Sequence, residues 1–195
     1  MRSEGGIALL EFALVLPILL LLYVGTVEVA NLMSNLRKLD LFTRTVGDFA
    51  GGASAPSRQE IDGMFKASKV VLMPFDTEKV EIVVSAVGVI GTAASGPMQV
   101  CSSVAASNAT PRAVREIPAV APPAELRVRG ARMLLVETRM PYQPRTGSLF
   151  TSLVGQSLSG VVFSRQMYWP VGTGLRYHSQ APEIVLPNGE ACPPS

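Results

Sequence analysis

The stretch that decides the fold is GIALLEFALVLPILLLLYVGTV, residues 6–27. From Ile7 to Val27 it holds 21 residues, and Glu11 is the one charged side chain among them. A helix rises about 1.5 Å per residue, so this run is long enough to cross the roughly 30 Å of hydrocarbon in a bilayer. The stretch therefore predicts a membrane-spanning helix. Pro17 removes one backbone donor in its middle, which predicts either a kink or a harmless bend.

A cleaved secretory signal is the alternative reading of this N-terminus. Arg2 is opposed by Glu4, and the apolar run is too long for the core of a signal peptide. The end of the run also lacks a small-x-small pair. These features favour a helix that is retained in the membrane.

The helical pattern continues beyond the apolar run. Spacings of three and four residues place one narrow apolar seam on the helix: Gly25, Val29, Leu32, Leu36, Leu39, Val46 and Ala50. The charged side chains of Arg37, Asp40 and Arg44 fall off this seam. We expect one helix over residues 7–50, apolar at first and amphipathic afterwards. Its seam either packs on the globular part of the chain or belongs to a coiled coil.

The remaining residues, 51–195, suffice for one compact domain with its own core. The formal net charge of +2 and the lack of a Lys/Arg run argue against nucleic acid as a partner. Arg127 and Arg129 alternate with Leu126 and Val128, which is typical of the solvent face of a strand rather than of a binding patch.

Local patterns predict one helix and several strands in this domain. Ser57 and Glu60 form the S-x-x-E capping pattern, which predicts a helix over residues 57–72 that ends before Pro74. Strands are expected over residues 79–90, 98–105, 125–140, 155–169 and 183–186, with a bulge at Gly130 and a proline-rich loop over 111–123. Short strands separated by turns favour an antiparallel sheet. The predicted fold class is therefore α+β, with the long N-terminal helix packed on an antiparallel sheet.

The sequence offers no catalytic constellation. His178 is the one histidine, no G-x-S-x-G surrounds a serine, and the two cysteines lack the C-x-x-C spacing. We therefore expect no enzyme activity, no metal site and no cofactor. The even pair Cys101 and Cys192 favours one disulfide in a chain that leaves the cytoplasm, and two buried free thiols are the alternative.

The N-terminus resembles that of type IV pilin-like proteins, and specifically that of the TadE-like pseudopilins of the Tad (tight adherence) pilus system. The residues that carry the resemblance are Gly6, the run Ile7-Ala8-Leu9-Leu10, and Glu11-Phe12-Ala13-Leu14-Val15-Leu16-Pro17. Looser similarity is found at Met73-Pro74-Phe75 and at Leu134-Leu135-Val136-Glu137 followed by Tyr142-Gln143-Pro144. The resemblance implies a pilin-like fold.

The resemblance also implies how the chain is processed. In that family a prepilin peptidase cuts after the glycine, which makes Ile7 the first residue and Glu11 the fifth residue of the mature chain. The implied domains are a leader over 1–6, a transmembrane and amphipathic helix over 7–50, and an extracytoplasmic α+β head over 51–195. Glu11, Phe12 and Pro17 are implied in assembly and in pairing with the new N-terminus.

The function that the resemblance implies is that of a minor pilin or pseudopilin that primes or caps a Tad-type pilus for adhesion or secretion. Its implied partners are the prepilin peptidase, other Tad pilins and pseudopilins, the inner-membrane assembly platform and the lipid bilayer. The implied location is the bacterial inner membrane, crossed once with a cytoplasmic N-terminus and a periplasmic head, or the pilus after assembly. Basic residues after the apolar run, among them Arg37 and Lys38, favour the opposite orientation. They lie on a continuing helix, however, and long domains translocate largely regardless of charge.

Two other classes of function are left as alternatives. One is a bitopic, membrane-anchored binding module whose extracytoplasmic head never enters a filament. The other is a membrane-anchored enzyme, against which the lack of a catalytic motif argues.

Overall fold

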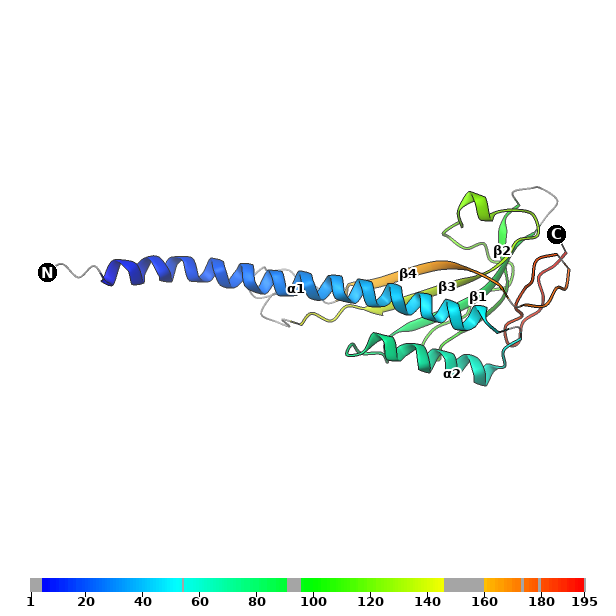
Figure 1. The fold of residues 1–195 in the computed structure, drawn as a ribbon, viewed down its shortest axis with the longest axis horizontal. Helices are drawn as coiled ribbons and strands as arrows, with labels where there is room; N and C mark the ends of the chain where they lie inside the picture. Colours follow the sequence, from blue (N-terminus) through cyan, green and yellow to red (C-terminus); the bar gives the residue numbers. More distant parts are fainter. Residues whose placement is uncertain are drawn as a thin grey trace. The chain divides into compact units, whose positions relative to one another are not determined.

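The computed structural model describes residues 5–53, 55–90, 96–145, 160–172, 174–178 and 180–194. Two helices are followed by four strands (Figure 1): α1 (Gly5–Gly51), α2 (Arg58–Lys69), β1 (Glu81–Val89), β2 (Met98–Ala105), β3 (Arg132–Pro141) and β4 (Val162–Pro170). Short 3-10 helices lie at η1 (Val70–Leu72) and η2 (Ala124–Leu126). The predicted α+β class, with a long N-terminal helix and an antiparallel sheet, is confirmed.

The chain divides into two compact units. The first, which we call the N-terminal unit, combines residues 1–37 with residues 141–162. The second, which we call the sheet unit, combines residues 38–140 with residues 163–195. The two units are described separately below.

Helix α1 has 47 residues and continues through Pro17 without a break. From Ala8 to Tyr23 its apolar part is exposed, with Leu9 at 72% and Tyr23 at 69% exposure. Within the described part of the chain, it is the one helix long and apolar enough to cross a membrane, and an 18-residue stretch of it has a mean hydropathy of 2.4. The predicted helix over residues 7–50 is confirmed.

The sheet unit contains a four-stranded sheet in the order β2-β1-β3-β4, in which β1 pairs antiparallel with both β2 and β3. One face of the sheet packs on both helices in a single apolar core that includes Leu39, Phe42, Val46, Ile61, Phe65, Ile82, Val84, Leu134 and Val136. Side chains alternate between faces along a strand, so Met133 and Leu135 contribute to a second apolar cluster on the opposite face. The register of β2 skips one residue, Cys101, at a bulge.

Helix α2 begins where the capping pattern predicts. The Ser57 side chain accepts a hydrogen bond from the Glu60 amide at 3.3 Å, and the Glu60 carboxylate accepts from the Ser57 amide at 2.7 Å. These two bonds satisfy backbone donors that the first turn of a helix leaves without partners.

Two strand predictions are wrong in part. The segment 125–131 is not strand, because η2 and a turn occupy it and β3 begins at Arg132. Gly130 has φ of 76° and ends that turn, so it is not a strand bulge. Over residues 183–186 the structure has only one isolated bridge, between Leu175 and Glu183. In the predicted strand over 155–169, residues 155–159 lie outside the described residues, and β4 begins at Val162.

The predicted apolar seam of α1 is right in one part and wrong in another. Leu39, Val46 and Ala50 are buried in the core of the sheet unit. Earlier on the helix Val29 is 56% exposed, although the seam included it. The buried side chains there are polar: Glu28, Asn31 and Asn35. Their distant partners explain this reversal.

Candidate functional site

The predicted processing and assembly residues all lie in the first turns of α1. Gly6, Glu11 and Phe12 are exposed, with Phe12 at 60%. Pro17 lies inside the same helix. Positions four residues apart are neighbours on a helix surface, so the backbone at position 7 lies one turn from Glu11. The surface around Glu11 is apolar, with Leu10 and Leu14 exposed at 63% and 68%.

A buried polar cluster follows in the N-terminal unit, which sequence reasoning missed. Glu28, Asn31, Asn35 and Tyr142 are 2%, 8%, 3% and 4% exposed. The Tyr142 hydroxyl donates to Glu28 Oε1, and Asn31 Nδ2 donates to the Tyr142 oxygen at 3.1 Å. Asn35 Nδ2 donates to the Asn31 carbonyl at 2.7 Å. Burial, with the hydrogen bond to Glu28, raises the pKa of Tyr142 to about 12.

This cluster fastens the chain after β3 to α1. Glu28, Asn31 and Asn35 follow one another at three and four residues, so they share one helix face. Asn31 Nδ2 also lies 3.4 Å from the Gln143 carbonyl, and the Tyr142 amide donates to the Val161 carbonyl at 2.7 Å. A polar stripe at helical spacing was the one signal available in the sequence.

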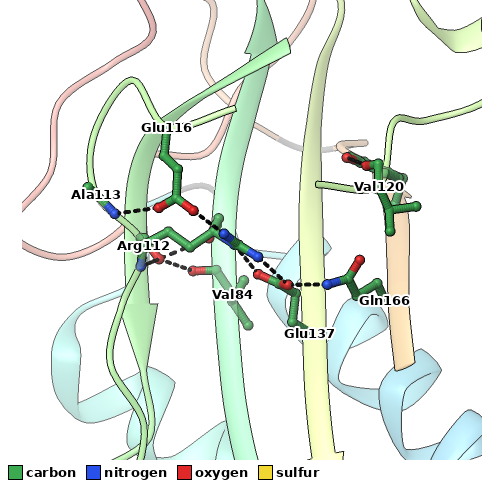
Figure 2. Close-up of polar contacts among 10 residues, drawn as sticks. Val84, Arg112, Ala113, Glu116, Val120, Glu137 and Gln166 are labelled. Carbon is green, nitrogen blue, oxygen red and sulfur yellow. Dashed lines mark hydrogen bonds and ion pairs between the residues drawn. The ribbon is translucent and has the colours of Figure 1, made fainter. Parts of the chain in front are cut away.

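A second polar cluster lies in the sheet unit, around Arg112 (Figure 2). The guanidinium of Arg112 forms ion pairs with Glu137 of β3 and with Glu116, which lie on its two sides. Gln166 Nε2 from β4 donates to Glu137 Oε1 at 2.6 Å. Hydrogen bonding to Glu137 raises the pKa of the Arg112 guanidinium. The adjacent cavity of about 370 Å³ is also lined by Glu81 and Arg139.

The charges of this second cluster are engaged with one another. Arg112 Nη2 donates to Glu137 Oε1 at 2.7 Å, and the Arg112 amide donates to Ser103 Oγ at 3.0 Å. The Arg112 side chain bonded to Glu137 of β3 and the Arg112 amide bonded to Ser103 of β2 together fix this loop on the sheet. Among the described residues, no group of three or more His, Cys, Asp or Glu side chains is placed to hold a metal ion.

Cys101 and Cys192 form a disulfide with a Cα–Cα distance of 4.9 Å, which ties the C-terminal segment to β2. Beside it, Arg132 of β3 pairs with Glu183, with Nε and Oε2 3.1 Å apart and both side chains almost fully buried. Glu183 Oε2 also accepts from the Cys192 amide at 3.2 Å, and Arg132 Nη2 donates to the Pro193 carbonyl at 2.9 Å. The disulfide and the ion pair hold the same segment.

Comparison with protein families gives one result. Residues 6–45 match the family model of TadE-like proteins. The N-terminal segment of this chain is therefore similar to that of TadE-like proteins. The match supports a protein associated with the Tad pilus, and TadE-like proteins are a structural, non-enzymatic kind of protein. No curated protein and no solved structure matches the chain significantly.

The TadE-like match contains the predicted processing and assembly residues Gly6, Ile7, Glu11, Phe12 and Pro17. It ends within α1 and includes none of the strands. The looser motifs outside it have structural roles. Glu137 holds Arg112, Tyr142 binds Glu28, and the Met73 carbonyl accepts a hydrogen bond from Lys38, whose Nζ lies 5.2 Å from the centre of the Phe75 ring.

Proposed function

We propose that this chain is a minor pilin or pseudopilin that primes or caps a Tad-type pilus used for adhesion or secretion. The observation that supports the proposal most strongly is the TadE-like match over residues 6–45, which includes the exposed apolar part of α1. An exposed apolar helix of this length needs lipid or other apolar helices around it. A pilin helix has lipid around it before assembly and neighbouring subunits afterwards.

The proposal includes processing and location. A prepilin peptidase cuts between Gly6 and Ile7 on the cytoplasmic side of the inner membrane. Residues 7–50 then form the membrane and amphipathic helix, and residues 51–195 form the periplasmic head. The inner-membrane assembly platform and other Tad pilins receive the processed chain, which either stays at the base of the pilus or enters the filament.

Glu11 has a specific part in this proposal. The free-energy cost of placing a carboxylate in the membrane is lower near the start of a helix than at its centre. Near the start, the carboxylate lies close to the interface and to the positive end of the helix dipole. Cleavage after Gly6 creates an ammonium on Ile7, one turn away in the same chain or beside Glu11 in a neighbouring one. Opposite charges attract strongly at low dielectric, so this pair sets the axial register of an incoming subunit.

The experiment compares variants in a strain that lacks the native gene. Glu11→Ala makes the helix more apolar, so membrane insertion and cleavage after Gly6 should persist while surface pili and co-purification of partner pilins are lost. Glu11→Gln removes the charge but keeps the size of the side chain, and this variant should also fail to assemble pili. Leu14→Ala is the matched control, since Leu14 lies exposed on the same helix, and it should assemble normally.

Normal cleavage of Glu11→Ala together with unchanged piliation would contradict the pairing of Glu11 with the new N-terminus. Unchanged piliation in the strain without the gene would contradict a role in pilus assembly. That second result would favour a membrane-anchored binding module that does not enter a filament.

A further inference from the structure

The cavity beside the Arg112 cluster has two charged side chains that the cluster does not use. Glu81 of β1 and Arg139 of β3 both line this cavity of about 370 Å³, and they stand directly opposite one another in the pairing of the two strands. Opposite charges placed in this way usually attract each other across a sheet. Within the described part of the chain, however, neither side chain forms an ion pair or a hydrogen bond. A free carboxylate and a free guanidinium therefore line one cavity.

The pairing of β1 with β3 places these charges on the same face of the sheet as Glu137. Glu81 stands opposite Arg139, and Val83 stands opposite Glu137. Residues two apart on a strand share a face, and so do residues that stand opposite one another. Glu81 and Glu137 are therefore diagonal neighbours, which lie about 7–8 Å apart in an antiparallel sheet. Val83 lies between them and also lines the cavity.

The wall of the cavity next to Arg112 is fixed by hydrogen bonds. Asn108 Nδ2 donates to the carbonyls of Glu78 and Val80 at 3.2 and 3.1 Å. The Arg112 amide donates to Ser103 Oγ of β2 at 3.0 Å. Both Asn108 and Arg112 line the cavity, so the loop between them is anchored at its two ends. A binding site that is ordered in advance loses less entropy when a ligand binds.

The charges that line the cavity do not balance. Figure 2 shows the guanidinium of Arg112 between the carboxylates of Glu116 and Glu137, so these three side chains carry one more negative charge than positive. Glu81 and Arg139 cancel in this count, which leaves one negative charge over among the charged side chains that line the described cavity. Glu137 is 9% exposed, and charges interact more strongly where water is excluded. The cavity therefore favours a ligand with a net positive charge.

We propose that this cavity binds a basic α-amino acid of about the size of lysine. The α-ammonium of the ligand pairs with Glu81, and its α-carboxylate accepts two parallel hydrogen bonds from the guanidinium of Arg139. The cationic end of its side chain lies beside Glu137 and Glu116, where it offsets the remaining negative charge. A lysine within a protein chain lacks the free α groups that Glu81 and Arg139 require, so the occupant is a small molecule. The proposal does not depend on the proposed pilus function.

The test measures the binding of radiolabelled lysine to the purified full-length chain in detergent, by equilibrium dialysis at low salt. We expect saturable binding, with competition by unlabelled lysine. Three analogues each lack one charged group: cadaverine lacks the α-carboxylate, ε-aminocaproate lacks the α-ammonium, and norleucine lacks the side-chain ammonium. Each should compete about tenfold more weakly or worse, because one charge of the site loses its partner. Absence of saturable binding, or an analogue that competes as well as lysine, would overturn the proposal.

Substitutions in the cavity then identify which group holds which end of the ligand. Glu81→Gln and Arg139→Gln should each raise the Kd of lysine about tenfold or more. Glu190→Gln, at an exposed position that does not line the described cavity, should leave the Kd unchanged. Arg139→Gln should also abolish the preference for lysine over cadaverine, and Glu81→Gln the preference for lysine over ε-aminocaproate. A merely structural effect would weaken binding without changing these preferences, so unchanged Kd values or unchanged preferences would overturn the proposal.

Discussion

The hydroxyl of Tyr142 donates a hydrogen bond to the carboxylate of Glu28, which lies 114 residues earlier in the chain. Both side chains are almost fully buried, and Asn31 donates to the same Tyr142 oxygen. Because a buried carboxylate needs donors, this contact explains why Glu28 is tolerated directly after the apolar run of α1. It also attaches the segment after β3 to that helix.

Removal of the Tyr142 hydroxyl should loosen this attachment. Tyr142→Phe takes one donor from buried Glu28, which should cost about 1–3 kcal/mol in local stability. The amide hydrogen of residue 142, which is bonded to the Val161 carbonyl, should then exchange with solvent about 5- to 150-fold faster. Each 1.4 kcal/mol of lost local stability raises the exchange rate about tenfold. Tyr177→Phe is the control, because Tyr177 is 43% exposed and its loss should change exchange there little. Equal exchange in both variants would contradict the role of the hydroxyl.

The same contact predicts a response to alkaline pH. The pKa of Tyr142 is raised from 10.0 to about 12 in the folded protein, so folding favours the neutral phenol. Its contribution to stability is therefore complete below pH 10, and it is lost as pH rises through about 12. The difference in phenolate absorbance between wild type and Tyr142→Phe should show one tyrosine that titrates near 12. A difference curve centred near 10, the ordinary value, would contradict the buried contact.

Several elements of the fold could be predicted because the signal is local. The apolar run predicts α1, the Ser57 and Glu60 capping pattern gives the start of α2, and Val and Ile over residues 79–90 predict β1. The segment 125–129 was wrongly predicted to be a strand because Leu126 and Val128 alternate with arginines, as residues on the two faces of a strand do. Pro122 and Pro123 precede it and Gly130 follows at positive φ, which favours a turn instead.

The polar sites could not be predicted in the same way, because their partners are far apart in the sequence. Periodicity places Val29 on the buried side of α1, yet Tyr142 provides hydrogen bonds that make Glu28 and Asn31 the buried residues. Likewise, nothing near Arg112 indicates that Glu137 of β3 binds it. The segment around Glu11 was recognisable as a family motif because the signal lies within one continuous stretch, and the roles of its residues stay predictions.

Loss of the disulfide should destabilise the sheet unit. Cys101 and Cys192 are 91 residues apart in the chain. The disulfide constrains a loop of this size in the unfolded chain, which stabilises the folded state. Cys101→Ser should therefore lower the free energy of unfolding by about 2–5 kcal/mol. Denaturant unfolding followed by the fluorescence of Trp169, the one tryptophan, measures this loss. Reduced wild type should match the double variant Cys101→Ser/Cys192→Ser. Two reactive thiols in unreduced, denatured protein would contradict the bond.

The contact of Gly47 with Trp169 makes a glycine necessary inside α1. A Cβ on Gly47 would lie 2.8 Å from Trp169 Cδ2. Gly47→Ala should therefore lower the free energy of unfolding by about 1–3 kcal/mol because of overpacking. The higher helix propensity of alanine should offset part of this loss. Gly63→Ala in α2 is the matched control, since a Cβ there meets nothing within 4 Å, and it should raise stability by about 0.5–1 kcal/mol. Equal stabilisation by both changes would show that Trp169 does not pack on Gly47.

The central claim, that this chain is processed and used as a pilin, is tested most directly by the N-terminal residue of the protein isolated from its native host. Gly6 offers no side chain to obstruct a peptidase, and we expect a membrane-spanning α1 to hold the bond after Gly6 near the membrane surface. Sequencing should therefore find Ile7 as the first residue, and Gly6→Val should leave the chain uncut. A mature protein that still begins at Met1 or Arg2, or that begins beyond Val24, would contradict the account.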